Sequence, residues 1–402
     1  MRTGIFAILL LTITLTGIVF YPFGFSLNVQ ANTTDVSNLQ HVDPRRAKNR
    51  VEAVFVLDTT GSMSGMINAA KEKIWSIATS MASAEGAAEV KIGLVAYRDR
   101  GDDYVTRVLD LSNDLDTMYA HLMDFKAAGG GDGPESVNKA LNDAVDNMSW
   151  SQDRRVYKVV FLVGDAPSHM DYKDEIQYPE IIKKAHTRGI VFNTIQSGKN
   201  SVAKAQWQRI ANLGQGNYFQ VGQSGNTVAI KTPFDRKMAA LSKKLDDTRI
   251  YYGTEVERKR QQKKVRAAEK LHVTASTASQ ARRAEFNIHK SGKANRLGKN
   301  ELVDDISSGR IKLSDIDKDK LPAEMRPMPV VQQRKLIEKQ SKLRDDLIIE
   351  IKELSTMRKN YIKKKIKGTE LEADSLDKKV YKSIREQAGK KGLKYASEPA
   401  AY

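Results

Sequence analysis

Short apolar runs alternate with segments of helical spacing along the first two thirds of the chain. Such runs are typical of strands buried on both faces, and they occur at residues 51–57, 90–97, 104–111, 156–163, 190–195 and 218–221. Apolar residues spaced three or four positions apart predict helices at residues 63–83, 115–125, 134–148, 178–188, 202–213 and 234–246. In the third helix, Pro134 is expected in the first turn, where its fixed φ is favourable.

Strands that alternate with helices of this length indicate βαβ units. The predicted fold class is therefore α/β, with a doubly wound, mainly parallel sheet over residues 51–248. Residues 104–111 follow the preceding strand through a Gly-Asp-Asp turn, so this strand is expected to run antiparallel at an edge.

Acidic loops gather at one edge of the predicted sheet. Asp58, Thr60 and Ser62 follow the first strand, Asp165 follows the fourth, and Asp132 lies in the glycine-rich loop 129–133 before a helix. In open α/β sheets, ligands bind beyond the carboxyl ends of the strands. The three carboxylates would repel one another without a cation, and hard cations such as Mg²⁺ prefer oxygen ligands. We therefore predict a metal site formed by these five residues.

The spacing Asp58-x-Thr60-x-Ser62 resembles the D-x-[ST]-x-S signature of the metal-ion-dependent adhesion site of von Willebrand factor A domains, as in integrin inserted domains and many bacterial surface proteins. Over residues 51–246, the strand end Tyr97-Arg98-Asp99 and the loops 129–135 and 164–167 are similar to those of A domains found beside alpha-kinases and in bacterial secreted proteins.

This resemblance implies that Asp58, Thr60 and Ser62 bind Mg²⁺, Mn²⁺ or Ca²⁺ and that Asp165 is the family's later aspartate, often a ligand through water. The family's separate threonine is not obvious in this sequence. Asp132 stands in the corresponding loop, which departs from the family pattern and makes the site more acidic. The alternative interpretation is that Asp58 and Thr60 only cap a helix.

Other patterns give weaker functional signals. The glycine run 129–133 lacks the Lys-Ser/Thr that follows in nucleotide-binding loops, so a nucleotide is not expected. His169 could complete a triad with Asp165 and Ser62, but the chain lacks a nucleophile elbow, and a surface or capping role is favoured. The charged residues 98–103 either shape ligand specificity or form a solvated turn.

The first 31 residues predict export from the cytoplasm. Arg2 precedes an uncharged apolar run, and small residues end at Ala31, as in a cleaved secretory signal peptide. The run is nearly long enough for an uncleaved membrane anchor, which stays open as an alternative. Residues 32–50 are polar and predict a linker. The chain has no cysteine, so stability outside the cytoplasm would come without disulfides.

Residues 249–402 predict a basic, mostly helical extension. From residue 231 onward there are 43 Lys and Arg against 25 Asp and Glu, a balance of +18 that leaves −1 for the rest of the chain. Residues 251–272 predict a basic helix, 274–299 a loose polar segment, and 302–321 a small helical hairpin. Residues 330–366 predict a long helix with heptad spacing, either in a coiled coil or packed against residues 251–272.

Three functions follow as hypotheses. The first is a binding module whose metal accepts an acidic side chain of a protein partner. The second is an envelope structural protein that acts through the basic extension, which would be attracted to membrane surfaces or anionic envelope polymers. The third and weakest is a hydrolase with a metal-activated water. The chain is expected not to be an enzyme, and nucleic acid is an unlikely partner because no pattern of stacking aromatics occurs.

Overall fold

The computed structural model describes residues 50–82, 84, 89–131, 133–221, 230–367 and 376–396. The predicted signal peptide, the linker up to residue 49 and Asp132 lie outside these residues. In the described part of the chain, no helix has the length and apolar character needed to cross a membrane.

A six-stranded sheet forms the centre of the fold, in the order β3-β2-β1-β4-β5-β6. All neighbouring strands are parallel except β2 and β3, so the predicted α/β class and the antiparallel edge strand are both confirmed. The strands are β1 (Arg50–Asp58), β2 (Glu89–Tyr97), β3 (Thr106–Ser112), β4 (Tyr157–Gly164), β5 (Ile190–Ser197) and β6 (Tyr218–Val221).

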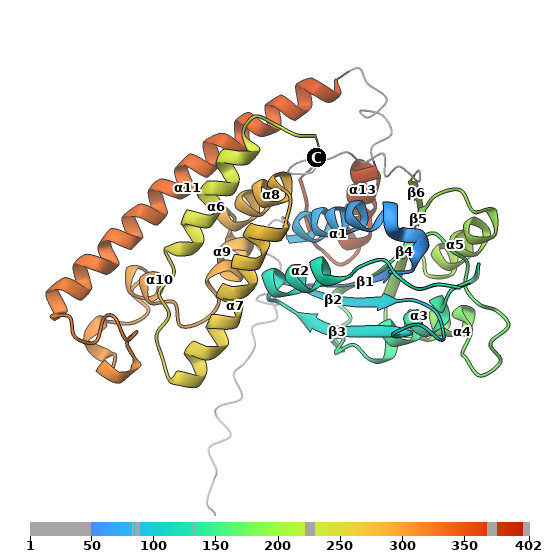
Figure 1. The fold of residues 1–402 in the computed structure, drawn as a ribbon, viewed down its shortest axis with the longest axis horizontal. Helices are drawn as coiled ribbons and strands as arrows, with labels where there is room; N and C mark the ends of the chain where they lie inside the picture. Colours follow the sequence, from blue (N-terminus) through green and yellow to red (C-terminus); the bar gives the residue numbers. More distant parts are fainter. Residues whose placement is uncertain are drawn as a thin grey trace, which may run out of the picture. The chain divides into compact units, whose positions relative to one another are not determined.

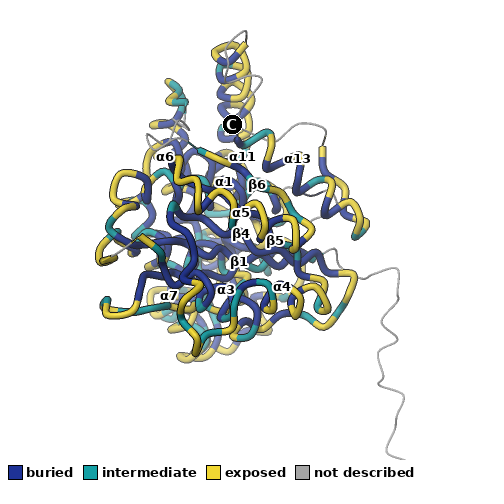
Figure 2. The backbone as a smooth tube through the Cα atoms, turned by 90° about the vertical axis from the view of Figure 1, so that its right-hand side faces the viewer, coloured by how far each residue is buried: buried dark blue, intermediate teal, exposed yellow. Residues whose placement is uncertain are grey.

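Strand β1 contributes to a separate apolar core on each face of the sheet. Phe55 and Leu57 belong to one core, with α1 (Ile67–Ala82) and α2 (Leu115–Asp124). Val54 and Val56 belong to the other, with α3 (Val137–Asp146), α4 (Tyr178–Thr187) and α5 (Ser201–Leu213). Figure 1 shows α1 and α2 on one side of the sheet and α3 and α4 on the other. Because successive side chains point to opposite faces, a strand apolar at every position is buried on both, as the dark β1 and β4 of Figure 2 show.

The strand order places a ligand-binding edge between β1 and β4. The chain continues from β1 to β2 on one side and later enters β4 on the other, so the order of strands reverses at this point. Doubly wound sheets bind ligands in the crevice outside the carboxyl ends of the strands at such a reversal. Asp58 ends β1 and Asp165 follows Gly164 at the end of β4, which puts both at this crevice.

Helix α3 begins at Val137, and the prediction of a helix from Pro134 was wrong. Glu135 is instead extended and forms a short parallel bridge with Ser168. Its N–H donates to Pro167 O at 2.9 Å, and His169 N–H donates to Glu135 O at 3.1 Å. These backbone hydrogen bonds to the loop after β4 delay the start of the helix.

The segment predicted to be loose, residues 274–299, contains two helices, and that prediction was wrong. Helix α8 (Thr277–Ile288) is buried from Ala278 to Asn287, and α9 (Lys290–Leu297) follows it. Alanines allow α8 to pack closely on α6 (Asp235–Asp247) and α1, and its buried Arg283 is paired with acidic side chains of other helices. The Arg283 guanidinium bonds Asp116 on α2 and Asp246 on α6, at 2.7 Å each. The segment has few apolar residues, and for this reason it was predicted to be loose. Its buried face instead includes Arg283, which can be buried because it is paired with two carboxylates.

The described residues of the C-terminal part also contain the helices α7 (Glu255–Thr274), α10 (Leu302–Ser307), α11 (Val330–Ile366) and α13 (Leu376–Gly389). Helix α11 has the bounds expected for it but packs on α6, α8 and α10, so the predicted packing against residues 251–272 was wrong. Its Leu347, Ile351 and Leu354 share a core with Met238 and Leu245 of α6. The basic helix predicted there, α7, packs on α2.

The last helix belongs to the core of the sheet domain. Val380 and Ile384 of α13 are buried in the same core as Phe55 and α1. Tyr157 on β4 donates a 2.6 Å hydrogen bond from its hydroxyl to Gln387 Oε1. Residues 376–389 therefore stabilise the domain although 155 or more residues separate them from β6 in sequence.

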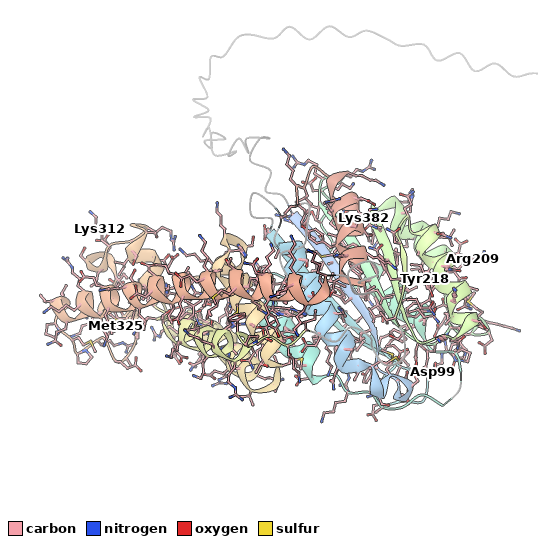
Figure 3. All side chains as sticks on the ribbon, turned by 90° about the horizontal axis from the view of Figure 1, so that it is seen from above. Asp99, Arg209, Tyr218, Lys312, Met325 and Lys382 are labelled. Carbon is pink, nitrogen blue, oxygen red and sulfur yellow. The ribbon has the colours of Figure 1, made fainter. Side chains whose placement is uncertain are left out.

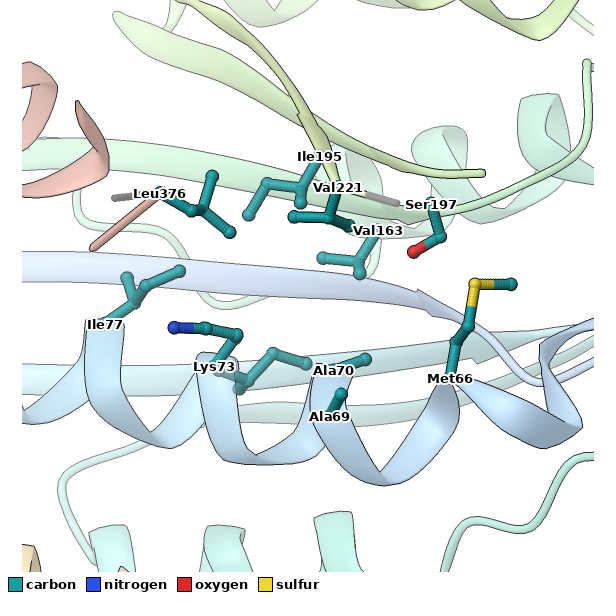
Figure 4. A pocket seen from close by; sticks show the side chains of 11 residues that line it. Met66, Ala69, Ala70, Lys73, Ile77, Val163, Ile195, Ser197, Val221 and Leu376 are labelled. Carbon is teal, nitrogen blue, oxygen red and sulfur yellow. The ribbon is translucent and has the colours of Figure 1, made fainter. Parts of the chain in front are cut away.

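A small apolar cavity lies where α1, β4, β5, β6 and the start of α13 meet (Figure 4). Its volume of about 20 Å³ exceeds only slightly the roughly 10–15 Å³ that one water needs. The Lys73 side chain borders it but donates to Asp377 on α13 at 2.6 Å. We interpret this cavity as a packing gap in the core.

Candidate metal site

The loop after β1 is held by hydrogen bonds to the neighbouring strand and to its own aspartate. Thr59 donates from its N–H and its hydroxyl to Tyr97 O, at 2.9 and 2.8 Å. Asp58 is fully buried, and its Oδ1 accepts from the N–H of Thr60 at 2.9 Å and from its hydroxyl at 2.6 Å. The carboxylate therefore organises the loop that carries the other predicted ligands.

Four of the five predicted site residues lie together as one cluster of oxygen atoms, in which each hydroxyl donates to a different aspartate. The hydroxyls of Thr60 and Ser62 are 3.0 Å apart, and Ser62 Oγ donates to Asp165 Oδ1 at 3.0 Å. Together with the bonds between Thr60 and Asp58, these contacts join the ends of β1 and β4. The fifth residue, Asp132, lies outside the described residues.

Gly164 allows the two strand ends to approach each other. A Cβ atom at this position would lie 2.6 Å from the Tyr97 hydroxyl oxygen and 2.7 Å from Asp58 Cβ. Gly130 has a similar role in the glycine-rich loop, where its φ is +78°. A Cβ atom at this position would lie 3.2 Å from both Thr60 Cβ and Glu135 Oε1, which is a tight contact. The glycines thus permit close contact around the acidic groups.

Glu135 is a site residue that was not predicted. It is 3% exposed and lines the same cavity as Ser62 and Asp165. Its Oε2 has no hydrogen-bond partner within the described residues. Such an unpaired buried oxygen is costly, and it indicates that a cation or water belongs beside it. The sequence could have indicated Glu135, because it is the second acidic residue of the loop 129–135, from which only Asp132 was predicted as a ligand.

The electrostatics of the site favour protonated carboxyls. Burial, with a further contribution from the charge of Asp165, raises the pKa of Asp58 to about 7. Burial and the charges of Asp58 and Asp99 raise the pKa of Glu135 to about 9. Burial also raises the pKa of Asp165. A divalent cation would reverse this preference by stabilising the charged forms.

The donor set fits a hard cation that binds oxygen. Asp58 and Asp165 supply carboxylate oxygens, and Thr60 and Ser62 supply hydroxyl oxygens already directed towards them. Within the described residues, no three His, Asp or Glu side chains are grouped as metal ligands on their own. A cation here would therefore depend on the two hydroxyls and on water, an arrangement suited to Mg²⁺, which usually keeps several waters.

A cavity of about 230 Å³ opens beside these groups. Ser62, Glu135 and Asp165 line one part of it, and Lys199 and Asn200, from the loop between β5 and α5, line another. This volume leaves room for a metal ion, its waters and part of a ligand. The site is therefore accessible from solvent although Asp58 is buried.

The charged residues 98–103 include both structural and exposed members. Arg98 is buried and donates from Nε to Thr59 O at 3.2 Å. Asp99, labelled in Figure 3, accepts a 2.8 Å hydrogen bond from Ser136 Oγ and lies 3.3 Å from His169 Nε2. Arg100 is more exposed and pairs with Asp174. The first two position the loops of the site, so the interpretation as a wholly solvated turn was wrong.

The fold and the arrangement of these loops agree with a family comparison. The model of the von Willebrand factor A domain matches residues 52–233, which span β1 to β6. The chain carries a von Willebrand factor A domain. The resemblance drawn from Asp58, Thr60 and Ser62 is thereby confirmed at the level of the domain.

Two curated relatives match part of this chain. The alpha-protein kinase vwkA of Dictyostelium discoideum is 28% identical over 126 residues, which are 31% of this chain and 20% of the kinase. A putative ariadne-like RING finger protein of Acanthamoeba polyphaga mimivirus is 26% identical over 119 residues, 30% of this chain and 11% of that protein. The chain thus spans a fifth or less of either relative.

Solved structures of low identity also match the A domain. The proximal thread matrix protein 1 of the mussel byssus, described with a zinc-occupied MIDAS motif, is 15% identical with a TM-score of 0.35, over 45% of this chain and 43% of that one. The SpRpn10 VWA domain is 13% identical with a TM-score of 0.35, over 46% of this chain and 95% of that one.

Proposed function

We propose that the A domain binds a divalent cation, with Mg²⁺ the first candidate and Mn²⁺ or Ca²⁺ as alternatives, and uses it to bind an acidic group of a protein partner. The observation that carries this proposal is the cluster of oxygen atoms from Asp58, Thr60, Ser62 and Asp165, beside the unpaired oxygen of Glu135. Asp58, Thr60, Ser62 and Asp165 would hold the ion, and Asp132 stays a predicted contributor.

The bound ion would supply a concentrated positive charge at the cavity. A carboxylate from a partner is the ligand that best matches such a charge among oxygen donors. We therefore propose a binding role and not a catalytic one, for adhesion or for assembly outside the cytoplasm. An A domain suits this role because it presents the site on loops held by a rigid sheet.

Calorimetry of the full chain with Mg²⁺ tests the metal site. The native protein should bind Mg²⁺, and Asp58→Ala and Ser62→Ala should weaken binding at least tenfold. Ser62→Ala removes only an exposed hydroxyl, so it separates metal binding from folding. Asp247→Ala, an exposed aspartate on α6, is the matched control and should bind as the native protein does. Equal Mg²⁺ binding by all four proteins would contradict the proposal.

We also propose export, with cleavage after Ala31 and a final location in the periplasm, at the cell surface or outside the cell. The support is the charge and apolar pattern of residues 1–31. N-terminal sequencing of the protein recovered from the cell envelope or medium should begin at Asn32. Recovery in the membrane fraction with Met1 retained would favour the uncleaved anchor, and recovery in the cytoplasm would contradict export.

A second candidate function is attachment to an anionic membrane or envelope polymer through the helical extension. The observation that favours it is the run of Lys363, Lys364 and Lys365, all exposed in the last turn of α11. Basic residues there also complement the helix dipole, so they stabilise α11 as well. Replacing the three lysines by glutamine should reduce sedimentation with vesicles of anionic lipid, whereas Ser62→Ala should not. Unchanged sedimentation would contradict this role.

A further inference from the structure

The cavity beside the proposed metal site has walls of opposite charge. Glu135 and Asp165 line it from the loops before α3 and after β4, and Lys199 lines it from the loop after β5. Lys199 is the single basic residue among the described residues that line the cavity. No ion pair to Lys199 is formed within the described part of the chain, and its side chain is exposed. Its ammonium is therefore available to a ligand.

The backbone that carries Lys199 is held in place on both sides. Gly198 N–H donates to Val221 O at 2.9 Å, and Gln220 Nε2 donates to Gly198 O at 2.8 Å. Asn200 caps α5, where its Oδ1 accepts from Val202 N–H at 3.0 Å, and its carbonyl accepts from Gln196 Nε2 at 2.8 Å. A fixed loop keeps Lys199 at the cavity and reduces the entropy lost when its ammonium binds an acid.

The N-terminal end of α5 also favours the binding of an anion near Lys199. Lys199 lies directly before α5, a helix of 13 residues whose N-terminal end has a partial positive charge. Glu135, which lines the same cavity, carries an unpaired buried oxygen beside which a cation or water belongs. The two observations are independent, and they lie on different elements of one cavity.

We propose that Lys199 forms a second acid-binding position, so that the ligand is a protein segment with two neighbouring acidic side chains. One carboxylate would face the cation held by Asp58, Ser62 and Asp165, and the other would face the Lys199 ammonium. This inference rests on the proposed metal-dependent function and adds the class of ligand to it. Lys199 is thus a specificity-determining residue, which favours paired acids over single ones.

The test uses the full chain with saturating Mg²⁺ and four small probes: acetyl-Glu-Glu-amide, acetyl-Glu-Gln-amide, acetyl-Gln-Glu-amide and acetyl-Gln-Gln-amide. Binding is followed by NMR through the methyl signals of Val202, which is 58% exposed beside Lys199. The native protein should bind the diacid about three- to tenfold more tightly than either monoacid, because a statistical factor of about two for two carboxylates is multiplied by the contribution of a partly exposed ion pair. The probe without acid should not bind.

Lys199→Gln should reduce the advantage of the diacid to the statistical factor of about two and should keep the native affinity for the monoacids. The matched control is Lys204→Gln, which removes the same charge from an exposed position on α5 outside the cavity lining. It should keep the preference for the diacid. This control separates local recognition from the general attraction of a basic chain for an anion.

The outcomes distinguish the two proposals. If Mg²⁺ and the monoacids bind but the diacid has no advantage beyond the statistical factor of about two, or if Lys199→Gln keeps the full native advantage, the second acid-binding position is wrong and the metal site stands. A failure of every probe to bind in the presence of bound Mg²⁺ also overturns the Lys199 proposal. If Asp58→Ala binds the monoacids as tightly as the native protein does, the metal-dependent function itself is wrong.

Discussion

Ser62 Oγ donates a 3.0 Å hydrogen bond to Asp165 Oδ1, although the two residues are 103 positions apart in sequence. Ser62 lies in the short helix after β1, and Asp165 directly follows β4. Parallel pairing of these two strands in the middle of the sheet brings their carboxyl ends together. The contact therefore forms only when the chain between Ser62 and Asp165 has folded and placed β4 beside β1. The candidate site depends on this edge of the sheet and not on one loop alone.

Gly164→Ala is expected to destabilise the site. The new methyl group would lie 2.6 Å from the Tyr97 hydroxyl oxygen and 2.7 Å from Asp58 Cβ, so β1 and β4 would have to move apart. We expect a loss of about 1–3 kcal/mol in the free energy of unfolding, measured by urea denaturation, together with weaker Mg²⁺ binding. Gly389→Ala meets no atom within 4 Å and should have almost no effect. Equal stabilities would show that the strand ends are less tightly packed.

Glu135→Gln is expected to weaken Mg²⁺ binding while the fold is kept. The amide preserves the shape of a side chain that is 3% exposed but removes a negative charge beside Asp58 and Asp165. Loss of a group next to metal ligands typically reduces metal affinity about tenfold or more. Calorimetry with Mg²⁺ checks this, and Glu180→Gln on the exposed face of α4 serves as the control. Unchanged affinity would remove Glu135 from the site.

Arg283→Leu is expected to destabilise the junction between the A domain and the C-terminal helices. Arg283 is 1% exposed and binds both oxygens of Asp116 at 2.7 Å and Asp246 Oδ2 at 2.7 Å. Its loss would leave two buried carboxylates without this partner, at a cost of about 3–5 kcal/mol. Urea denaturation measures the effect. A loss below about 1 kcal/mol would mean that the buried network does not stabilise the junction.

The same network predicts sensitivity to acid. Burial is the largest single effect and acts to raise the pKa values of Asp116 and Asp246, but the charge and hydrogen bonds of Arg283 together with other nearby basic groups outweigh it, so both pKa values lie below the ordinary value of 3.8. A carboxyl whose pKa is lowered in the folded state stabilises the protein fully above pH 3.8, the ordinary pKa. This stabilisation is lost as the pH falls towards and through the pKa of the folded state. The free energy of unfolding should thus fall below about pH 4, and less steeply in Asp116→Asn. Equal slopes in a urea series at several pH values would contradict this.

Ile384→Ala is expected to destabilise the A domain from the far end of the chain. Ile384 is fully buried in the core that contains Phe55 and α1. Truncation of such a side chain costs about 2–5 kcal/mol. The neighbouring Lys382, which projects from α13 in Figure 3, is exposed, and Lys382→Ala should change stability by less than about 0.5 kcal/mol. Equal stability of the two variants would show that α13 contributes little to the domain.

The sheet could be predicted from sequence because its central strands β1 and β4 are apolar at most positions. β1 and β4 are buried along almost their whole length, and polar loops bound both of them. Helices α8 and α9 and the packing of α11 could not be predicted in this way. Arg283 and Arg358 are buried in ion pairs with Asp116 and Asp235, partners more than 100 positions away. A pattern that equates charge with exposure fails at such positions.

The candidate site was predictable in part. Asp58, Thr60 and Ser62 share one loop, so their proximity follows from local spacing, and Asp165 follows from the rule for strand ends. Glu135 was missed because its position depends on the backbone bridge with Ser168, which holds it extended before α3. Asp132 stays a prediction, since it lies outside the described residues.

The sequence by itself determined the alternation of strands and helices, the parallel sheet and the acidic loops at its carboxyl edge, because hydrophobic spacing and loop chemistry are local properties. Only the tertiary structure decided that Glu135 and Lys199 line the same cavity and that α8 and α13 are buried against the A domain. Those features depend on burial and charge pairing between residues far apart in the chain, where the partner, and not the residue type, determines whether a polar group can be buried.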